Sequence, residues 1–130
     1  MTGMRPSATV ARVGRTVLIV DDHGAFRSAA RALLEASGFD VVGEAADGTS
    51  ALAAARQLRP DIVLLDVQLP DLDGFAVAER LALDTVRPAI VLTSSRSIGS
   101  FRRRLAANPG LTFIAKNDLS GEALAAATAV

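Results

Sequence analysis

The chain contains no cysteine, so it can form neither a disulfide bond nor a thiolate metal site. Its formal net charge is zero, so no overall field favours nucleic acid or an acidic membrane surface as a partner. No apolar run approaches the ~20 residues that a membrane-spanning helix needs. The N-terminal segment carries arginines without a continuous apolar core, which makes it a poor signal peptide. These absences favour a cytoplasmic protein that binds neither nucleic acid nor membrane through this segment.

Lysine and histidine are nearly absent: each occurs once, as Lys116 and His23, whereas thirteen of the fourteen basic residues are arginine. A lone lysine in an arginine-favouring chain indicates a position that needs a compact point charge. His23 follows two acids and invites a metal-ligand or nucleophile interpretation, but we expect it to pack in a loop or first helical turn. Arg102 to Arg104 would spread over ~200° of a helix, which predicts a solvated face and not a nucleic-acid site.

The 130 residues are 50% hydrophobic and 22% charged, which suits one domain with a substantial core. Residues 1–15 have no periodicity and are interpreted as a flexible tail, so the domain spans residues 16–130. The apolar and β-branched runs predict strands, and the apolar spacing between them predicts helices. The expected strands are Thr16–Val20, Asp40–Glu44, Ile62–Leu65, Ala89–Leu92 and Leu111–Ala115, and the expected helices are Ala25–Ser37, Ser50–Leu58, Phe75–Leu83, Ile98–Ala107 and Leu119–Ala129.

Strands and helices therefore alternate with short links, which is typical of a mostly parallel sheet covered by helices on both faces. We expect an α/β fold with a doubly wound five-stranded parallel sheet of order 2-1-3-4-5, as in flavodoxin-like proteins. Leu33 and Leu34 on the first helix, Leu52 on the second and Leu81 on the third are expected to lie in the core.

Two of the most apolar strands end on carboxylates: one at Asp21 and Asp22, the other at Asp66. In this strand order the two strands are neighbours, about 4.8 Å apart, and ligands bind where their carboxyl ends meet. Two carboxylates 4 Å apart repel by about 4 kcal/mol at an effective dielectric constant near 20, so the cluster needs a counter-ion. Mg²⁺, which takes one or two carboxylates together with waters and a phosphate, fits this need.

The remaining strand ends carry groups that suit a phosphoryl ligand. The fourth strand runs into Thr93, Ser94 and Ser95, which supply hydroxyl and backbone N–H donors, and the fifth runs into Lys116. Acids, a hydroxyl and an ammonium would thus converge on one edge of the sheet.

With these motifs in place, the chain resembles the response-regulator receiver domains of two-component signalling. The resemblance rests on Val20-Asp-Asp-His23, the segment Asp66-Val-Gln-Leu-Pro-Asp-Leu-Asp-Gly74, Leu92-Thr-Ser94 and Phe113-Ile-Ala-Lys116, in this order and nearly in the family's spacing. It covers about Thr16 to the C-terminus. The Asp-Asp-His start is similar to receivers that usually precede a helix-turn-helix DNA-binding domain.

The resemblance implies that Asp66 is the phosphoacceptor and takes a phosphoryl group from a phosphohistidine of a sensor histidine kinase. It also implies a Mg²⁺ site formed directly by Asp22, Asp66 and the backbone carbonyl of Gln68, with Asp21 acting through a metal-bound water. Such a domain is not an enzyme beyond assisting its own phosphotransfer and autodephosphorylation.

The same resemblance gives roles to four further residues. Thr93 would hydrogen-bond the phosphoryl group with help from the Ser94 N–H, and Lys116 would pair with a phosphoryl oxygen. Phe113 takes the place of the family's switch aromatic, whose rotamer follows Thr93. Phosphorylation would then remodel the surface of the fourth helix, fifth strand and fifth helix, which serves output or homodimerisation in this family.

The chain departs from the family pattern around its fourth helix. The stretch from Thr93 to Lys116 is about one residue longer than usual, and Ser95–Ser100 lacks the acids common there. These departures keep open a pseudo-receiver, which has the same fold but acts as a constitutive interaction module. A flavin-binding protein is disfavoured because Asp21 and Asp22 would repel the flavin phosphate, and an aspartyl phosphatase would need an acid at Gln68. Simple helix or turn capping by the acids is the weaker interpretation of the cluster.

Overall fold

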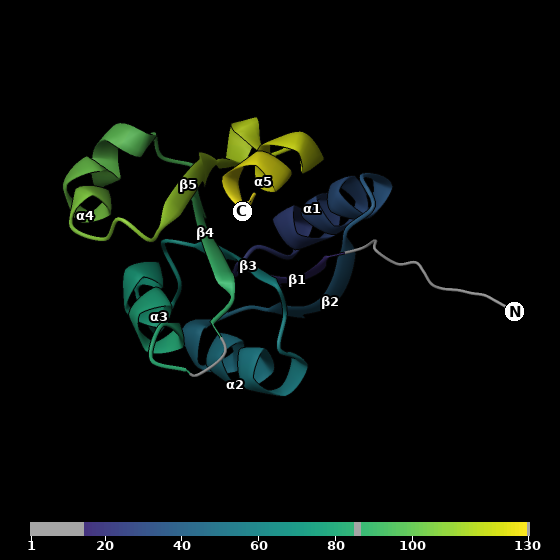
Figure 1. Cartoon of the computed structure of the whole chain (residues 1–130), viewed down its shortest axis with the longest axis horizontal. Coiled ribbons are helices and arrows are strands. Elements are labelled where there is room, and N and C mark those ends of the chain that lie inside the picture. Colours follow the sequence, from purple (N-terminus) through teal and green to yellow (C-terminus); the bar gives the residue numbers. More distant parts are fainter. Residues whose placement is uncertain (1–14, 85–86, 130) are drawn as a thin grey trace, which may run out of the picture.

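The computed structural model describes residues 15–84 and 87–129, and all statements about structure concern these residues. Strands and helices alternate along the chain (Figure 1). The strands are β1 (Thr16–Val20), β2 (Asp40–Ala45), β3 (Ile62–Asp66), β4 (Ala89–Ser94) and β5 (Thr112–Ala115). The helices are α1 (Gly24–Ala36), α2 (Gly48–Leu58), α3 (Gly74–Leu81), α4 (Arg102–Ala106) and α5 (Gly121–Ala127), with 3₁₀ turns at Ile98–Phe101 and Lys116–Asp118.

All strand pairs are parallel and the order is β2-β1-β3-β4-β5, which confirms the predicted doubly wound topology. The register aligns Val20 with Leu65 between β1 and β3, and Asp66 with Thr93 between β3 and β4. Because parallel strands all end at the same edge, the residues that follow β1, β3, β4 and β5 meet there. This edge is called the carboxyl edge below.

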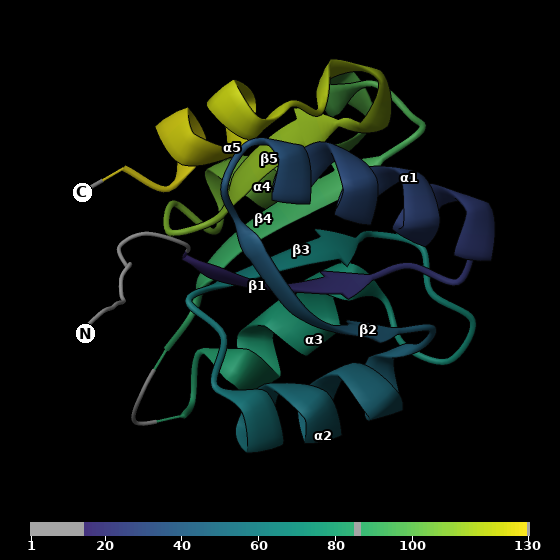
Figure 2. The same ribbon diagram turned by 90° about the vertical axis from the view of Figure 1, so that its right-hand side faces the viewer.

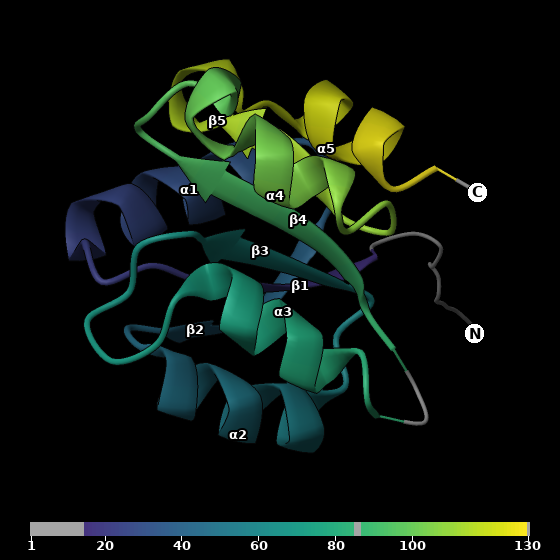
Figure 3. The same ribbon diagram turned by 90° about the vertical axis from the view of Figure 1, so that its left-hand side faces the viewer.

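The sheet is buried on both faces, which explains the continuous apolar strands. Along β1, Val17 and Ile19 join one core cluster, which α1 and α5 cover, whereas Leu18 and Val20 join the other, which α2, α3 and the α4 region cover. Figure 2 shows α1 and α5 on one side of the sheet with α2 and α3 on the other, and Figure 3 shows α4 over β4. The two packed layers hold the strand ends in place and so position the carboxyl edge.

The predicted tail, residues 1–15, lies outside the described residues except for Arg15. The Arg15 carbonyl accepts a hydrogen bond from Asp40 N at 3.0 Å, and its Nη1 donates to Thr128 Oγ1 at 2.8 Å. Arg15 is therefore tied to β2 and to the end of α5. Among the helices described, none is long and apolar enough to cross a lipid bilayer.

The last two helices differ most from their sequence predictions. The predicted helix Ile98–Ala107 begins as a 3₁₀ turn and is α-helical only from Arg102, and the predicted helix Leu119–Ala129 begins at Gly121. Ser120 explains the later start, since its side chain accepts a hydrogen bond from Ala123 N at 2.9 Å as an N-cap. The expected core position of Leu33 is also wrong: Leu34 is fully buried, but Leu33 is 37% exposed. Consecutive helical residues point about 100° apart, so both cannot face the sheet.

The N-terminus of α2 is tied to the loop that follows β3. The helix starts at Gly48, two residues before its prediction, and Asp47 caps it by accepting from Ser50 N at 2.7 Å. Asp71 reaches the same turn and accepts from Gly48 N at 2.7 Å and from Thr49 N at 3.0 Å. These hydrogen bonds hold the pKa of the Asp71 carboxyl well below its usual range, and the one from Gly48 has the largest effect. The loop between β3 and α3 is therefore fixed at both ends.

Candidate functional site

Three carboxylates gather at the carboxyl edge, as the sequence predicts. Asp21 is fully buried and Asp66 is 3% exposed, whereas the Asp22 side chain is 38% exposed. Asp21 follows β1 and its backbone N–H donates to Ala45 O at 3.0 Å, which continues the β1–β2 pairing. Asp66 is the last residue of β3. Two buried acids, Asp21 and Asp66, thus lie beside a solvent-exposed acid, Asp22.

Lys116 lies against both buried acids. Its Nζ is 2.6 Å from Asp21 Oδ2 and 3.6 Å from Asp66 Oδ2, and its side chain is 15% exposed. The ammonium also lies 4.4 Å from the centroid of the Phe26 ring, within cation–π range. The predicted convergence of the lone lysine with the acids is therefore present in the structure.

The Asp66 carboxyl has a raised pKa. Burial is the main cause, because it penalises the charged form, and the negative charges of Asp21 and Asp22 add to it. Two contacts act in the opposite direction: the Gln68 N–H donates to Asp66 Oδ1 at 3.2 Å, and Lys116 is nearby. The raised pKa means that the ionised Asp66 is unfavourable in the folded protein when no cation or ligand compensates it.

We therefore expect Asp66→Asn to stabilise the protein against unfolding at pH 7 without divalent cations, by on the order of 1 kcal/mol, a typical effect of one substitution. The amide is isosteric and can still accept from the Gln68 N–H. Because the folded pKa lies above the ordinary 3.8, the native state binds more protons than the unfolded chain above that pH. The free energy of unfolding of the wild type therefore falls as the pH rises from 3.8 through the pKa of Asp66 in the folded protein, and it stays lower at higher pH.

Urea unfolding of both proteins as a function of pH measures the effect. The advantage of the variant should be present at pH 7 and vanish below pH 3.8. A variant that is less stable than the wild type at pH 7 would contradict the proposed burial penalty. Asp40→Asn, an exposed acid at the amino end of β2, is the matched control.

The hydroxyl of Thr93 has no partner at the same edge. Thr93 is fully buried, pairs in register with Asp66, and its Oγ1 takes part in no hydrogen bond. A buried hydroxyl without a partner costs free energy, so such a group indicates a ligand that supplies the missing partner. Ser94 is also buried, but its Oγ accepts from Arg96 N at 3.0 Å and so shapes the following loop.

Gln68 and Phe113, the two other predicted site residues, lie at the border of the site. Gln68 is exposed and forms an isolated antiparallel bridge with Asp73, which closes the loop after β3. Phe113 is half-buried, with its ring centroid 5.6 Å from that of Phe101, which in turn is 6.3 Å from Phe75. The aromatic side chain thus packs towards α3 and α4 and not among the acids.

The α4 region is attached to the start of α3 by a contact that the sequence did not predict. Arg104 Nη2 donates to Asp73 Oδ1 at 2.8 Å, and the guanidinium lies 4.0 Å from the centroid of the Phe75 ring. Asp73 is the N-cap of α3 and accepts from Phe75 N at 2.7 Å. One residue of the predicted solvated arginine face therefore joins α4 to the loop that follows Asp66.

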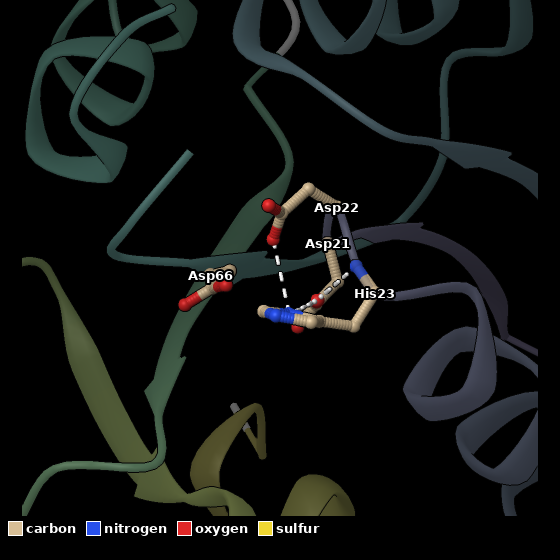
Figure 4. Close-up of side chains that lie close together, drawn as sticks. All are labelled: Asp21, Asp22, His23 and Asp66. Atoms are coloured by element: carbon tan, nitrogen blue, oxygen red, sulfur yellow. Dashed lines mark hydrogen bonds and ion pairs between the residues drawn. The ribbon is translucent and has the colours of Figure 1, made fainter. Parts of the chain in front are cut away.

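His23 lies in the loop directly before α1, as expected, but its side chain contacts the acids and is mostly exposed instead of packing there. It is the N-cap of α1, its side chain is 68% exposed, and its Nδ1 lies 3.0 Å from Asp22 Oδ1 and 3.1 Å from Asp21 Oδ1 (Figure 4). Its backbone N–H also donates to Asp21 Oδ1, at 2.9 Å. Its position directly after two acids is the sequence signal that pointed to this contact.

The side chains of the edge fit a divalent cation. One ligand atom from each of Asp21, Asp22, His23 and Asp66 lies within 4.8 Å of the others. When ionised, the three acids carry three negative charges against the single positive charge of Lys116, so the edge lacks about two positive charges. Carboxylate oxygens are ligands that Mg²⁺ prefers. The donor set and its charge therefore match the predicted cofactor, with Asp22 facing solvent, where an ion enters.

Comparisons with known proteins show the family of this chain. Residues 17–127 match the family model described as response regulator receiver domain. A Pseudomonas aeruginosa protein named as a transcriptional regulator is 39% identical over 88% of this chain and 55% of its own length. The virulence-factor transcription regulator BvgA of Bordetella pertussis is 36% identical over 88% of this chain and 54% of its length. The receiver domain of NarL from Mycobacterium tuberculosis has a TM-score of 0.76 at 27% identity and covers 90% of this chain and 98% of that one.

The chain therefore belongs to the response-regulator receiver domains of two-component systems. It spans about half the length of the two transcription regulators it matches. Receiver domains interact with histidine kinases and generally bind Mg²⁺ through acidic residues, and a cluster of acids lies at this edge.

Proposed function

We propose that this chain is a phosphorylatable receiver that accepts a phosphoryl group on Asp66 from a sensor histidine kinase in a Mg²⁺-dependent reaction. One observation carries the proposal: Asp66 is a buried carboxylate that shares its edge with Lys116 and with the unpartnered hydroxyl of Thr93. A purely structural acid would not need a buried hydroxyl that has no partner. A phosphoryl group on Asp66 offers oxygens to both of these side chains.

In the transfer, an Asp66 carboxylate oxygen attacks the phosphorus, a P–O bond forms, and the P–N bond to the donor imidazole breaks. Lys116 pairs with a phosphoryl oxygen, and Thr93 Oγ1 donates its hydrogen bond to another, with the Ser94 N–H assisting. Lys116 already lies beside Asp66 before the reaction, so its effect on the transition state costs little reorganisation. Mg²⁺, when bound, neutralises negative charge on the phosphoryl oxygens.

The cation would be held by Asp22, Asp66 and the Gln68 carbonyl, with Asp21 reaching it through a water. Asp21 suits the indirect role because its Oδ2 already pairs with Lys116 and its Oδ1 accepts from the His23 N–H. Asp22, which is exposed, is free to approach a cation from the solvent side. The chain itself supplies no further catalytic activity beyond assisting phosphoryl transfer and its own dephosphorylation.

The output surface would be α4, β5 and α5, used for homodimerisation or for an effector. A shift of Thr93 towards a phosphoryl group would free space for Phe113, whose ring packs at a tilt against Phe101 at the start of α4. The names of the relatives support regulation of transcription as an output of such a switch. The domain would act in the cytoplasm and bind neither nucleic acid nor membrane through this segment.

The test is incubation of the purified chain with acetyl phosphate and Mg²⁺, followed by intact mass spectrometry. We expect the mass of one phosphoryl group to be added to the wild type and to Asp40→Asn, and to be absent from Asp66→Asn. The adduct should also be lost when a chelator removes the cation. An adduct that persists in Asp66→Asn would assign the phosphoacceptor elsewhere and overturn the proposal.

A constitutive interaction module is the second candidate, because α4 is only Arg102–Ala106 and follows a 3₁₀ turn. Such a module would keep one output surface whether or not Asp66 is modified. Amide hydrogen exchange of α4, β5 and α5 with and without acetyl phosphate separates the two candidates. Changed exchange after modification supports the switch, and unchanged exchange supports the constitutive module.

A further inference from the structure

His23 contacts the acids through a nitrogen that can bind a metal ion. Its Nδ1 is 3.0 Å from Asp22 Oδ1 and 3.1 Å from Asp21 Oδ1, and Figure 4 shows the contacts of the ring with both carboxylates. His23 does not use its side chain as a helix cap, although it stands at the N-cap of α1. The ring is therefore held by the acids alone, with most of its surface in solvent.

We infer that His23 is a nitrogen ligand of the acid site, so that this chain binds divalent transition-metal ions such as Ni²⁺ or Zn²⁺ preferentially over Mg²⁺. The inference deepens the proposed function because it concerns the cation of the same site. Imidazole suits Zn²⁺, Ni²⁺ and Cu²⁺, whereas Mg²⁺ prefers oxygen ligands and releases its waters reluctantly. One nitrogen ligand therefore changes which cations the site prefers and not only its affinity for cations in general.

The spacing of the donor atoms supports this role. Two adjacent ligands of an ion with bonds of about 2.1 Å and an angle near 90° lie about 3.0 Å apart. The two distances from His23 Nδ1 to the carboxylate oxygens have this value. Little rearrangement is then needed for the imidazole and the Asp22 carboxylate to share one ion.

A second observation concerns the buried oxygen atoms of the same edge. Among the described residues, two buried side-chain oxygens lack a hydrogen-bond partner, Asp21 Oδ2 and Thr93 Oγ1, and both are at this edge. Asp21 is fully buried, and its Oδ2 contacts Lys116 Nζ in an ion pair outside hydrogen-bonding geometry. The edge thus contains one buried hydroxyl oxygen without a partner, Thr93 Oγ1, whereas Asp21 Oδ2 is compensated by Lys116.

The same distances also fit an alternative in which Nδ1–H donates to the carboxylates and only orients them. The two roles differ in what they predict for metal affinity. A ligand selectively increases the affinity for transition metals, whereas an orienting residue affects all cations alike. The affinity ratio between Ni²⁺ and Mg²⁺ is therefore the quantity that separates them.

The experiment is titration calorimetry of the whole chain at one fixed pH with Ni²⁺ and with Mg²⁺, comparing the wild type with His23→Gln. We expect His23→Gln to lower Ni²⁺ affinity by at least about tenfold, since even supporting residues around metal ligands typically contribute 10–100-fold. Its Mg²⁺ affinity should change less than about twofold. Asp22→Asn, which removes a shared ligand, should weaken both ions.

Zn²⁺ gives a direct readout, because His23 is the only histidine of the chain and its imidazole ¹⁵N signals need no assignment. We expect stoichiometric Zn²⁺ to shift the Nδ1 resonance in the wild type and much less in Asp22→Asn. An unmoved imidazole in a protein that binds Zn²⁺, or equal loss of Ni²⁺ and Mg²⁺ affinity in His23→Gln, overturns the inference. Neither result affects phosphorylation of Asp66 with Mg²⁺, so the proposed function is tested separately.

Discussion

Replacing Lys116 with methionine is expected to destabilise the protein by about 3 kcal/mol at pH 7 without divalent cations. The Asp21 side chain is fully buried, and Lys116 Nζ lies 2.6 Å from its Oδ2. Removing one partner of a buried ion pair typically costs about 3–5 kcal/mol, because an uncompensated charge stays inside the protein. Methionine keeps an apolar stem of similar length, so the loss reports the charge.

The double variant Lys116→Met/Asp21→Asn is the matched control. Neutralising Asp21 removes the charge that the lysine compensates, and the amide oxygen can still accept from the His23 N–H. We expect this variant to be more stable than Lys116→Met alone, which denaturant unfolding in a double-mutant cycle would measure. If Lys116→Met lost less than about 1 kcal/mol, or if the second substitution were purely additive, the lysine would not be compensating Asp21.

Mg²⁺ should reduce the destabilisation in Lys116→Met, because a bound cation supplies positive charge at the same edge. A ligand that binds only the folded protein stabilises it by about 1.4 kcal/mol at ten times its dissociation constant. The increase in unfolding free energy on adding Mg²⁺ should therefore be larger in this variant than in the wild type. The comparison links the stability of the fold to the charge of the site.

The fold was predictable because its strongest signals are local and repeated. Each strand is a continuous apolar run, and the strand β1 that the sequence predicts at Thr16–Val20 has these bounds in the structure. The alternation of strands with helices then leaves few arrangements of the sheet. The acids were predictable for the same reason, since the end of a strand fixes the edge to which Asp66 belongs.

The start of α4 was not predictable, because tertiary contacts decide it. The spacing of Ile98, Phe101 and Leu105 predicts a continuous helix, yet Ile98 is 52% exposed and Phe101 is buried between Phe75 and Phe113. Packing of the Phe101 ring fixes the backbone at this point, where φ is −121° and ψ is 9°, outside the helical range. The local apolar pattern could not predict this packing, because Phe75 and Phe113 are far from Phe101 in the sequence.

Long-range side-chain contacts could not be predicted from the sequence either. Asp71 reaches Gly48 across 23 positions, and Arg104 reaches Asp73 across 31. Each of these residues is a common surface type whose partner is set by the fold. Such contacts hold the loop that follows Asp66. The conformation of this loop therefore became known only from the structure, whereas the acids of the site were predicted from the sequence.

Replacing Gly74 with alanine is expected to cost about 3 kcal/mol of stability and to slow phosphorylation of Asp66. A β-carbon at position 74 would clash with the Asp66 carbonyl oxygen and would lie only 2.8 Å from Val67 Cα. Both obstacles are backbone atoms, which cannot rotate away as a side chain does. Adding one methyl group to a packed interior typically costs about 1–3 kcal/mol, and the upper end applies where the backbone has to shift.

The shift would occur at the functional site, since Gly74 N donates to Val67 O at 2.8 Å and the clash is with Asp66 itself. Gly110→Ala is the matched control, because a β-carbon there has no atom within 4 Å and the glycine has no left-handed φ. We expect the control to change unfolding free energy by less than about 0.5 kcal/mol and to be phosphorylated at the wild-type rate. Equal stability of the two variants would show that the loop after β3 yields easily, and the rigid positioning of Asp66 would then need another explanation.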